Sequence, residues 1–416
     1  MRVFVNELKK IWNIKILGII ALFSVFFAVS MNGYIAGYPR GDWFLDVDFA
    51  HYLTENYGTT FELEDFEDFL KYEETIIGEV DEFVASRQVF SDAGILSFAD
   101  YWAFLEETGV LYDTLSDEEL EHRVTIQAEM GHITRLRDGT DIQPNPYEPS
   151  LAYHKWSSFQ SVVGRYHDNV LRDTEWGASI DNFMEYTPLN ERERNRLYEI
   201  RDSGELKNVL PFWTIFITRA YARQLAVLVL LTTLILVSQL ITSDRASKVN
   251  WLQYSSREGR NIFKKQFIAI LISALTMTTL LIGIFAGIYG VRTDVHALWN
   301  NGINSFLSFE FYWLSITFGQ YVLLMIGMMY LLSIGAAAFA FVLSRFSQNK
   351  IRLMFKIVPF FVVGMILSDW ILSYFLAIYD GGDWWLQLST LIVLLVVGLL
   401  MAMFVLRREN KVELLC

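Results

Sequence analysis

Few side chains in this sequence are placed where they could do chemistry, and Asp369 is the clearest of them. It is the only carboxylate within an apolar run, the stretch 357–379. A charged group in such a run is costly unless it faces a cavity or finds a partner, so Asp369 is a candidate contact for a substrate or an ion. The neighbouring Trp370 and Tyr374 indicate that Asp369 lies near a membrane interface. The alternative interpretation is that Asp369 has a structural role there.

The remaining reactive residues form no catalytic or metal-binding pattern. The six histidines are His51, His122, His132, His154, His167 and His296. No H-E-x-x-H motif occurs among them, so no metal site is expected. The single cysteine, Cys416, excludes an internal disulfide framework. No Ser/His/Asp or Cys/His arrangement stands out, and without a G-x-x-x-x-G-K-S/T phosphate loop the chain is not expected to be an ATPase itself.

The composition predicts a membrane protein. Its 53% hydrophobic and 15% aromatic residues, with a positive mean hydropathy, exceed what an ordinary soluble domain carries. Because a transmembrane helix needs about 20 apolar residues, six runs qualify. They are 16–38, 224–242, 266–291, 311–344, 357–379 and 384–406. We therefore predict an all-α polytopic membrane protein with six transmembrane helices.

The first of these helices, 16–38, follows a basic segment at residues 1–15. That segment carries four basic residues and one acid, with apolar residues at helical spacing, which is typical of an interfacial helix. A secretory signal peptide is the alternative interpretation of this region. We favour a retained helix because of the length of the apolar run and the need for an even number of spans. Ala28-Val29-Ser30 would also be a poor cleavage site.

Charge is distributed unevenly along the chain. Between Tyr34 and Thr218 there are 14 basic and 37 acidic residues. Four other segments, 1–15, 243–265, 345–356 and 407–416, together hold 17 basic residues and 5 acids. By the positive-inside rule these four segments are cytoplasmic, together with both termini, and the acidic region lies outside the cell. A bacterial cell membrane is the expected location.

The segment 39–218 is predicted to be a mostly α-helical extracytoplasmic domain inserted between helices 1 and 2. Apolar residues from Leu63 to Val84 fall on one face at a 3.6-residue period. Ser97 with Asp100, and Ser116 with Glu119, predict capping boxes at two helix starts. Further helices are expected at 157–172 and 189–202, with a proline-rich loop at 141–150 and stops at Gly109, Gly139 and Gly204.

The segment 219–416 holds helices 2–6 and several residues suited to packing or anchoring. Gly283 and Gly287 have the GxxxG spacing that permits close helix contact, although chance occurrence explains it equally well. Arg219 and Arg223 lie four residues apart and are expected to snorkel outward. The connection 292–313 is rich in Trp and Phe, which predicts an interfacial segment.

The loop 243–266, between helices 2 and 3, is expected to lie on the cytoplasmic membrane surface. It contains six basic residues, two acids and interspersed apolar residues. Its run W-L-x-Y-S-S-R-x-G-R-x-I-F-x-K-K, after Asp244-Arg245, resembles the ABC-2 type transporter permeases. The resemblance implies a coupling segment that contacts a separate ATPase. The residues carried over to this role are Asp244, Arg245, Trp251, Leu252, Arg257, Gly259 and Arg260.

The resemblance implies the permease subunit of an ATP-driven exporter of a peptide, drug, lipid or ion. Its partners would be two cytoplasmic ATP-binding subunits, which hold ATP and Mg, and a second permease subunit. This chain would bind no cofactor itself and would not be an enzyme. The family plan also has re-entrant helices between the last two spans, for which the turn 380–383 leaves little room.

The alternative function is a membrane receptor or sensor whose acidic outer domain recognises a ligand. Its charge could attract cationic ligands such as basic peptides, although a solvated surface explains the same composition. Nucleic acid is not an expected partner, because no basic patch with interleaved aromatic residues occurs there. A polytopic membrane enzyme is a third alternative.

Overall fold

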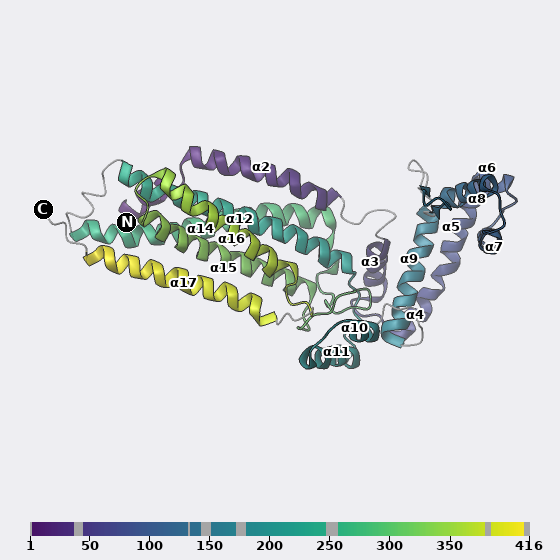
Figure 1. The fold of residues 1–416 in the computed structure, drawn as a ribbon. Coiled ribbons are helices and arrows are strands. Elements are labelled where there is room, and N and C mark those ends of the chain that lie inside the picture. The colour runs from purple at the N-terminus through teal and green to yellow at the C-terminus, as the bar shows by residue number, and fades with distance from the viewer. Residues whose placement is uncertain are drawn as a thin grey trace. The chain divides into compact units, whose positions relative to one another are not determined.

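The computed structural model describes residues 2–36, 45–131, 134–142, 151–171, 180–246, 257–378 and 384–411 (Figure 1). The chain divides into two compact units. The first, here called the membrane unit, comprises Met1–Tyr38, Ile215–Trp299 and Glu310–Cys416. The second, here called the acidic unit, comprises Pro39–Thr214 and Asn300–Phe309.

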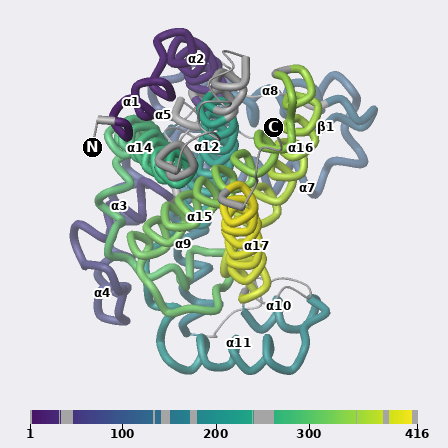
Figure 2. Tube along the Cα trace, turned by 90° about the vertical axis from the view of Figure 1, so that its left-hand side faces the viewer, coloured from purple at the N-terminus to yellow at the C-terminus, as the bar shows by residue number. Residues whose placement is uncertain are grey.

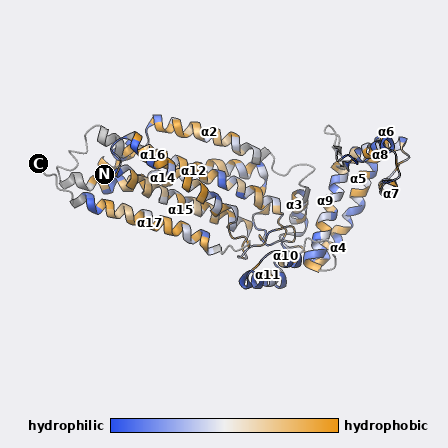
Figure 3. Cartoon of the chain, viewed as in Figure 1, coloured by the Kyte–Doolittle hydropathy of each residue, from blue (hydrophilic) through white to orange (hydrophobic). Residues whose placement is uncertain are grey.

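The membrane unit is a bundle of long helices. They are α1 (Arg2–Ile11), α2 (Ile14–Ala36), α12 (Phe212–Ala246), α14 (Arg257–Thr293), α15 (Phe318–Arg345), α16 (Lys350–Ser373) and α17 (Trp384–Lys411), with a short 3₁₀ helix, η2 (Val295–Leu298). All but α1 and η2 are long and apolar enough to cross a membrane, which confirms the expected six candidate spans. Figure 3 shows the apolar character of these helices along most of their length.

Helix α15 lies at the centre of this bundle, between α14 and α17 (Figure 2). Its small residues Gly335–Ala338 are all buried. At Gly398 of α17, a Cβ atom would lie 3.1 Å from the ring of Phe339 and 3.4 Å from Ala338. Small side chains on both helices therefore allow the close contact between α15 and α17.

The connection between α16 and α17 is not helical in the part that the structure describes. Residues 374–378 form a turn and a single bridge, in which Tyr312 pairs with Ala377. The amide of Trp313 donates to the carbonyl of Leu376 at 2.9 Å. A re-entrant helix is thus absent from 374–378, while 379–383 lie outside the described residues.

The acidic unit consists of short helices and one minimal hairpin. The helices are α3 (Leu45–Tyr57), α4 (Leu63–Leu70), α5 (Tyr72–Ser86), α6 (Gln88–Asp92), α7 (Phe98–Leu111), α8 (Asp117–Met130), α9 (Leu151–Tyr166), the π-helix η1 (His167–Leu171), α10 (Ile180–Tyr186) and α11 (Glu191–Ser203). Strands β1 (Thr134–Arg135) and β2 (Asp141–Ile142) pair antiparallel. One apolar cluster joins α5, α7, α8 and α9 around buried Tyr101 and Phe90.

A second cluster of the acidic unit is built from aromatic rings, and a distant segment completes it. The ring of Phe306 stacks on Phe61 at 6.0 Å and meets Tyr166 edge-on at 5.4 Å. Its amide donates to the carbonyl of Leu206 at 2.9 Å. Residues 300–309, expected as part of an interfacial connection, therefore belong to the core of the acidic unit.

In the acidic unit, the capping patterns predicted from the sequence lie at the starts of two helices, α7 and α8. Ser116 forms the full capping box with Glu119. Ser97 caps α7, but the carboxylate of Asp100 accepts the amide of Leu96 rather than completing the box. These starts follow the prediction because a hydroxyl and a nearby carboxylate satisfy amides that have no partner in the helix.

The predicted stops and lengths are less accurate. The helix expected through 63–84 is broken at Lys71 into α4 and α5. Gly109 lies inside α7, and α8 ends instead at Gly131, whose φ of 104° favours glycine. Gly204 ends α11 in the same left-handed conformation, as predicted.

The cap of α8 provides a test of local stability. Removing the Ser116 side chain by Ser116→Ala should destabilise the helix start by about 1 kcal/mol, which corresponds to roughly five-fold faster amide exchange in its first turn. The hydroxyl and amide of Ser116 hold the pKa of Glu119 below its usual range. Wild-type protection should therefore persist above the ordinary carboxyl pKa and fall as the pH drops through the lowered one.

Hydrogen exchange of the full-length protein measures this effect. Thr125→Ala is the matched control, because Thr125 lies exposed on the same helix and only bonds the carbonyl of Glu121. Equal exchange in both variants would contradict the capping role of Ser116.

Candidate functional sites in the membrane unit

The predicted coupling loop joins two antiparallel neighbouring helices. Near the start of α12, the Tyr221 hydroxyl donates to the carbonyl of Phe285, near the end of α14, at 2.8 Å. The rings of Tyr221 and Tyr289 stack 4.6 Å apart. The chain leaves α12 at Ala246 and enters α14 at Arg257. We call this end of the bundle the loop end, and the opposite end the Asp369 end.

The structure places five of the seven predicted coupling residues, in two groups. Asp244 and Arg245 lie in the last turn of α12. Arg257, Gly259 and Arg260 lie in the first turn of α14. The remaining two, Trp251 and Leu252, fall within 247–256, outside the described residues. The charged positions of the motif therefore stand at two helix ends, and their role in coupling stays a prediction.

A buried polar cluster at the loop end fixes α1 to the bundle. Glu7 is 4% exposed, and its Oε2 accepts from the Gln266 side chain at 3.0 Å. Its Oε1 accepts from Lys10 at 2.8 Å. Gln266 in turn accepts from Arg345 at 3.4 Å. The cluster thus joins α1 and α15 at Gln266, the last residue of the predicted coupling loop.

Other contacts hold the same elements together. The indole of Trp12 donates to the Ser273 hydroxyl of α14 at 3.1 Å. The Arg345 guanidinium lies over the ring of Phe263, 3.9 Å from its centre. The segment predicted as an interfacial helix is therefore also packed on α14. Two sequence signals pointed to this cluster: Glu7 is the lone acid among basic neighbours, and Arg345 follows a long uncharged run.

Asp369 has a specific partner in the structure. Its Oδ1 accepts from Nη1 of Arg223 on α12 at 3.1 Å, and the same nitrogen donates to the Ser373 hydroxyl at 2.9 Å. Arg223 therefore bridges α12 and α16 rather than only reaching outward. This pairing satisfies the requirement that a carboxylate in an apolar run finds a counter-charge. A role of Asp369 in substrate or ion contact stays a prediction.

The second arginine of this pair of positions, Arg219, does not snorkel. It is 4% exposed and lies 2.8 Å from Glu310, which also accepts from the hydroxyl of Tyr312. Removing such a buried partner leaves an uncompensated charge, which is strongly destabilising. The sequence alone did not indicate the structural role of Arg219, because its partner Glu310 lies 91 residues away.

The GxxxG pair makes no helix contact with the described residues of this chain. Gly283 and Gly287 are exposed on α14, and no atom lies within 4 Å of a Cβ placed at either position. The same face exposes Leu280, Ile284 and Ile288. Helix packing through this pair stays a prediction.

Three buried hydroxyl groups join the middle of the bundle. Ser333 of α15 bonds to Thr233 of α12 at 3.1 Å and to Thr278 of α14 at 2.8 Å. All three residues are 0% exposed. Interhelical hydrogen bonds of this kind each contribute about 0.6 kcal/mol, and up to 1–2 kcal/mol, in membranes. No sequence pattern singled them out, because hydroxyl residues are common in apolar helices.

No protein-family model, curated protein or solved structure matches this chain. What the chain does is therefore inferred from its own residues and their arrangement.

The Arg223–Asp369 pair gives a test that separates an ion pair from two independent residues. Arg223→Met and Asp369→Leu should each lower the melting temperature, because each leaves one charge without its partner near an apolar environment. The double variant should lose less stability than the sum of the single losses. Thermal unfolding in lipid nanodiscs measures this double-mutant cycle.

Ser373→Ala is the matched control, because it removes only the neutral partner of Arg223 and should lower the melting temperature less than either charge change. Strict additivity of the two charge variants would contradict the pairing.

Proposed function

We propose that this chain is the membrane-spanning permease subunit of an ABC-2 type exporter. The observation that supports this most is the position of the motif-bearing loop: Asp244-Arg245 and Arg257 to Arg260 stand at the ends of two adjacent long helices. The chain has six candidate membrane spans, and this loop joins the second and third of them. This is the arrangement that the family resemblance implies.

The lengths of α12 and α14 suit the transmission of movement. They contain 35 and 37 residues without interruption, so each extends about 50 Å at a rise of 1.5 Å per residue. A displacement at the loop end would move each helix as a unit. The hydroxyl cluster around Ser333 would carry the movement of α12 and α14 into α15.

The proposal includes partners that the chain does not contain. Two cytoplasmic ATP-binding subunits would hold ATP and Mg, and a second permease subunit, identical or different, would complete the pathway. The chain itself would bind no cofactor and catalyse no reaction. It would lie in a bacterial cell membrane with both termini in the cytoplasm and the acidic unit outside. The transported compound would be a peptide, drug, lipid or ion.

The proposed contact between the coupling loop and the ATPase can be tested by replacing either an apolar anchor, Trp251, or an exposed charge, Lys248. Loss of a buried aromatic anchor at an interface costs about 2 kcal/mol or more, whereas an exposed rim charge contributes roughly 0–1 kcal/mol. Trp251→Ala should therefore reduce co-purification of the ATPase about 30-fold or more, and Lys248→Ala at most about five-fold. Asp244→Ala should resemble Trp251→Ala.

Co-purification from cells that produce the ATPase and substrate-stimulated ATP hydrolysis provide the two measurements. A folded triple variant of Trp251, Leu252 and Asp244 to alanine that still binds the ATPase and transports normally would overturn the proposal. A sensor, the alternative function, would show ligand binding to the acidic unit without any ATPase partner.

The orientation is tested by cysteine labelling in a Cys416→Ser background. A cysteine at Ser91, exposed in the acidic unit, should react with an impermeant maleimide on intact cells, because the acidic unit is placed outside. A cysteine at Ser247 should react only after the membrane is permeabilised. Labelling of Ser247 alone on intact cells would reverse the orientation.

A further inference from the structure

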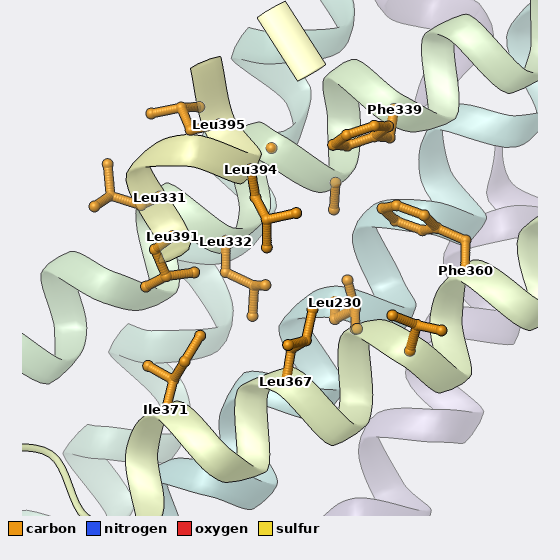
Figure 4. Close-up of a pocket in the computed structure, with 14 residues that line it drawn as sticks. Leu230, Leu331, Leu332, Phe339, Phe360, Leu367, Ile371, Leu391, Leu394 and Leu395 are labelled. Atoms are coloured by element: carbon orange, nitrogen blue, oxygen red, sulfur yellow. The ribbon is translucent and has the colours of Figure 1, made fainter. Parts of the chain in front are cut away.

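The membrane unit contains an apolar cavity between four of its helices. It lies among α12, α15, α16 and α17, has a volume of about 70 Å³, and is lined by 14 residues (Figure 4). Every lining side chain is aliphatic or aromatic, apart from two glycines. Such a cavity does not hold water, because a buried water needs two to four polar partners.

Glycine and two aromatic rings shape the cavity. Phe339 and Phe360 lie side by side at one end of it, with ring centres 5.1 Å apart (Figure 4). A Cβ at Gly335 would meet only the backbone of Leu395, at 3.8 Å. At Gly364 a Cβ would lie 2.8 Å from Leu230, so α16 touches α12 there. The cavity therefore lies between helices that contact one another beside it.

A second, smaller pocket adjoins the cavity toward the Asp369 end. It shares Leu332, Ile371 and Leu391 with the cavity, extends to Leu372, and is apolar apart from Ser368. From Phe360 to Leu372 the path follows twelve residues of α16, or about 18 Å at 1.5 Å per residue. One leaflet of the hydrocarbon core is about 15 Å thick, half of about 30 Å. The residues that line the two pockets therefore extend along α16 over about the length of one acyl chain, while the cavity itself has room for only part of such a chain.

On the α16 side, exposed apolar side chains line and adjoin the cavity. Val363 lines it and is 55% exposed, and the adjoining Val362 and Ile366 of α16 are exposed as well. Only 11% of the apolar span of α16 is buried in the chain. Around such a helix in a bilayer, the surrounding medium is lipid hydrocarbon.

Polar groups stand at the Asp369 end of the path. Gln387 lies one helical turn before Leu391 on α17, is 8% exposed, and donates to the carbonyl of Tyr374 at 3.2 Å. Its Oε1 has no hydrogen-bond partner within the described residues. Arg223 and Ser373 stand at the same end. From Phe360 toward the Asp369 end, the lining is first apolar and then polar. A lipid whose headgroup lies at the Asp369 end has the same order.

We propose that this cavity binds the terminal part of one acyl chain of a bilayer phospholipid from the leaflet at the Asp369 end. The chain enters past Val363 and ends against Phe339 and Phe360. It fills space that would otherwise leave the facing side chains without contact partners. The proposal depends on the membrane location of the unit and not on the coupling to an ATPase.

The test uses a phosphatidylcholine whose acyl chain carries a photoactivatable diazirine, included at low proportion in phosphatidylcholine vesicles with the full-length protein. Wild-type labelling should concentrate in the peptides that contain Leu332, Leu367 and Leu391, several-fold above the exposed face of α14 at Ile284. Leu367→Trp places a larger side chain in the cavity and should reduce labelling of Leu332 and Leu391 several-fold.

Two controls keep the test decisive. Ile284→Trp alters an exposed apolar face outside the cavity and should leave the labelling pattern of the cavity unchanged. Ala336→Val fills less space from the α15 side and should give a partial reduction if Leu367→Trp fails to fold. Labelling of Leu332 and Leu391 no stronger than that of Ile284, or unaffected by both filling variants, would overturn the proposal.

Discussion

The membrane unit depends on the close approach of helices to α15. Lipid hydrocarbon offers no hydrophobic driving force between helices, so their association relies on close van der Waals contact and buried hydrogen bonds. Gly335–Ala338 of α15 and Gly398 of α17 allow the close van der Waals contact. The hydroxyl of Ser333 makes the buried hydrogen bonds to α12 and α14. A bulky residue in this region would separate several helices at once, since they share one central neighbour.

Paired polar groups mark the two ends of the bundle and set which helices meet there. At the loop end, the cluster of Glu7, Gln266 and Arg345 joins α1, α14 and α15. At the Asp369 end, Arg223 joins α12 to α16. Glu7 and Arg345 are buried and would be costly without their partners, so this cluster acts on register as well as on stability. The wholly apolar cavity lies between the two ends.

The sequence predicted what depends on local composition and missed what depends on contact between distant segments. The six long apolar helices follow from length and hydropathy alone, and the Ser116 and Gly204 signals act within one turn. Arg219 and Asp369 needed partners 91 and 146 residues away, which no spacing rule supplies. The GxxxG pair was visible in the sequence, yet Gly283 and Gly287 face outward, since a motif does not specify which neighbour a helix has. The predicted coupling aromatics fall outside the described residues.

The acidic unit shows the same dependence on distant segments, with a consequence for how the two units are linked. Its aromatic cluster is completed by residues 300–309, which come from the connection between α14 and α15. Phe306 and Leu307 are fully buried there, and the side chain of Asn301 bonds Thr54 at 2.9 Å. Burying one such large apolar side chain contributes about 1.5–3 kcal/mol. The chain therefore passes between the units four times rather than twice. Residues 39–214 are then not the whole of the acidic unit, because excising them would expose Phe306 and Leu307.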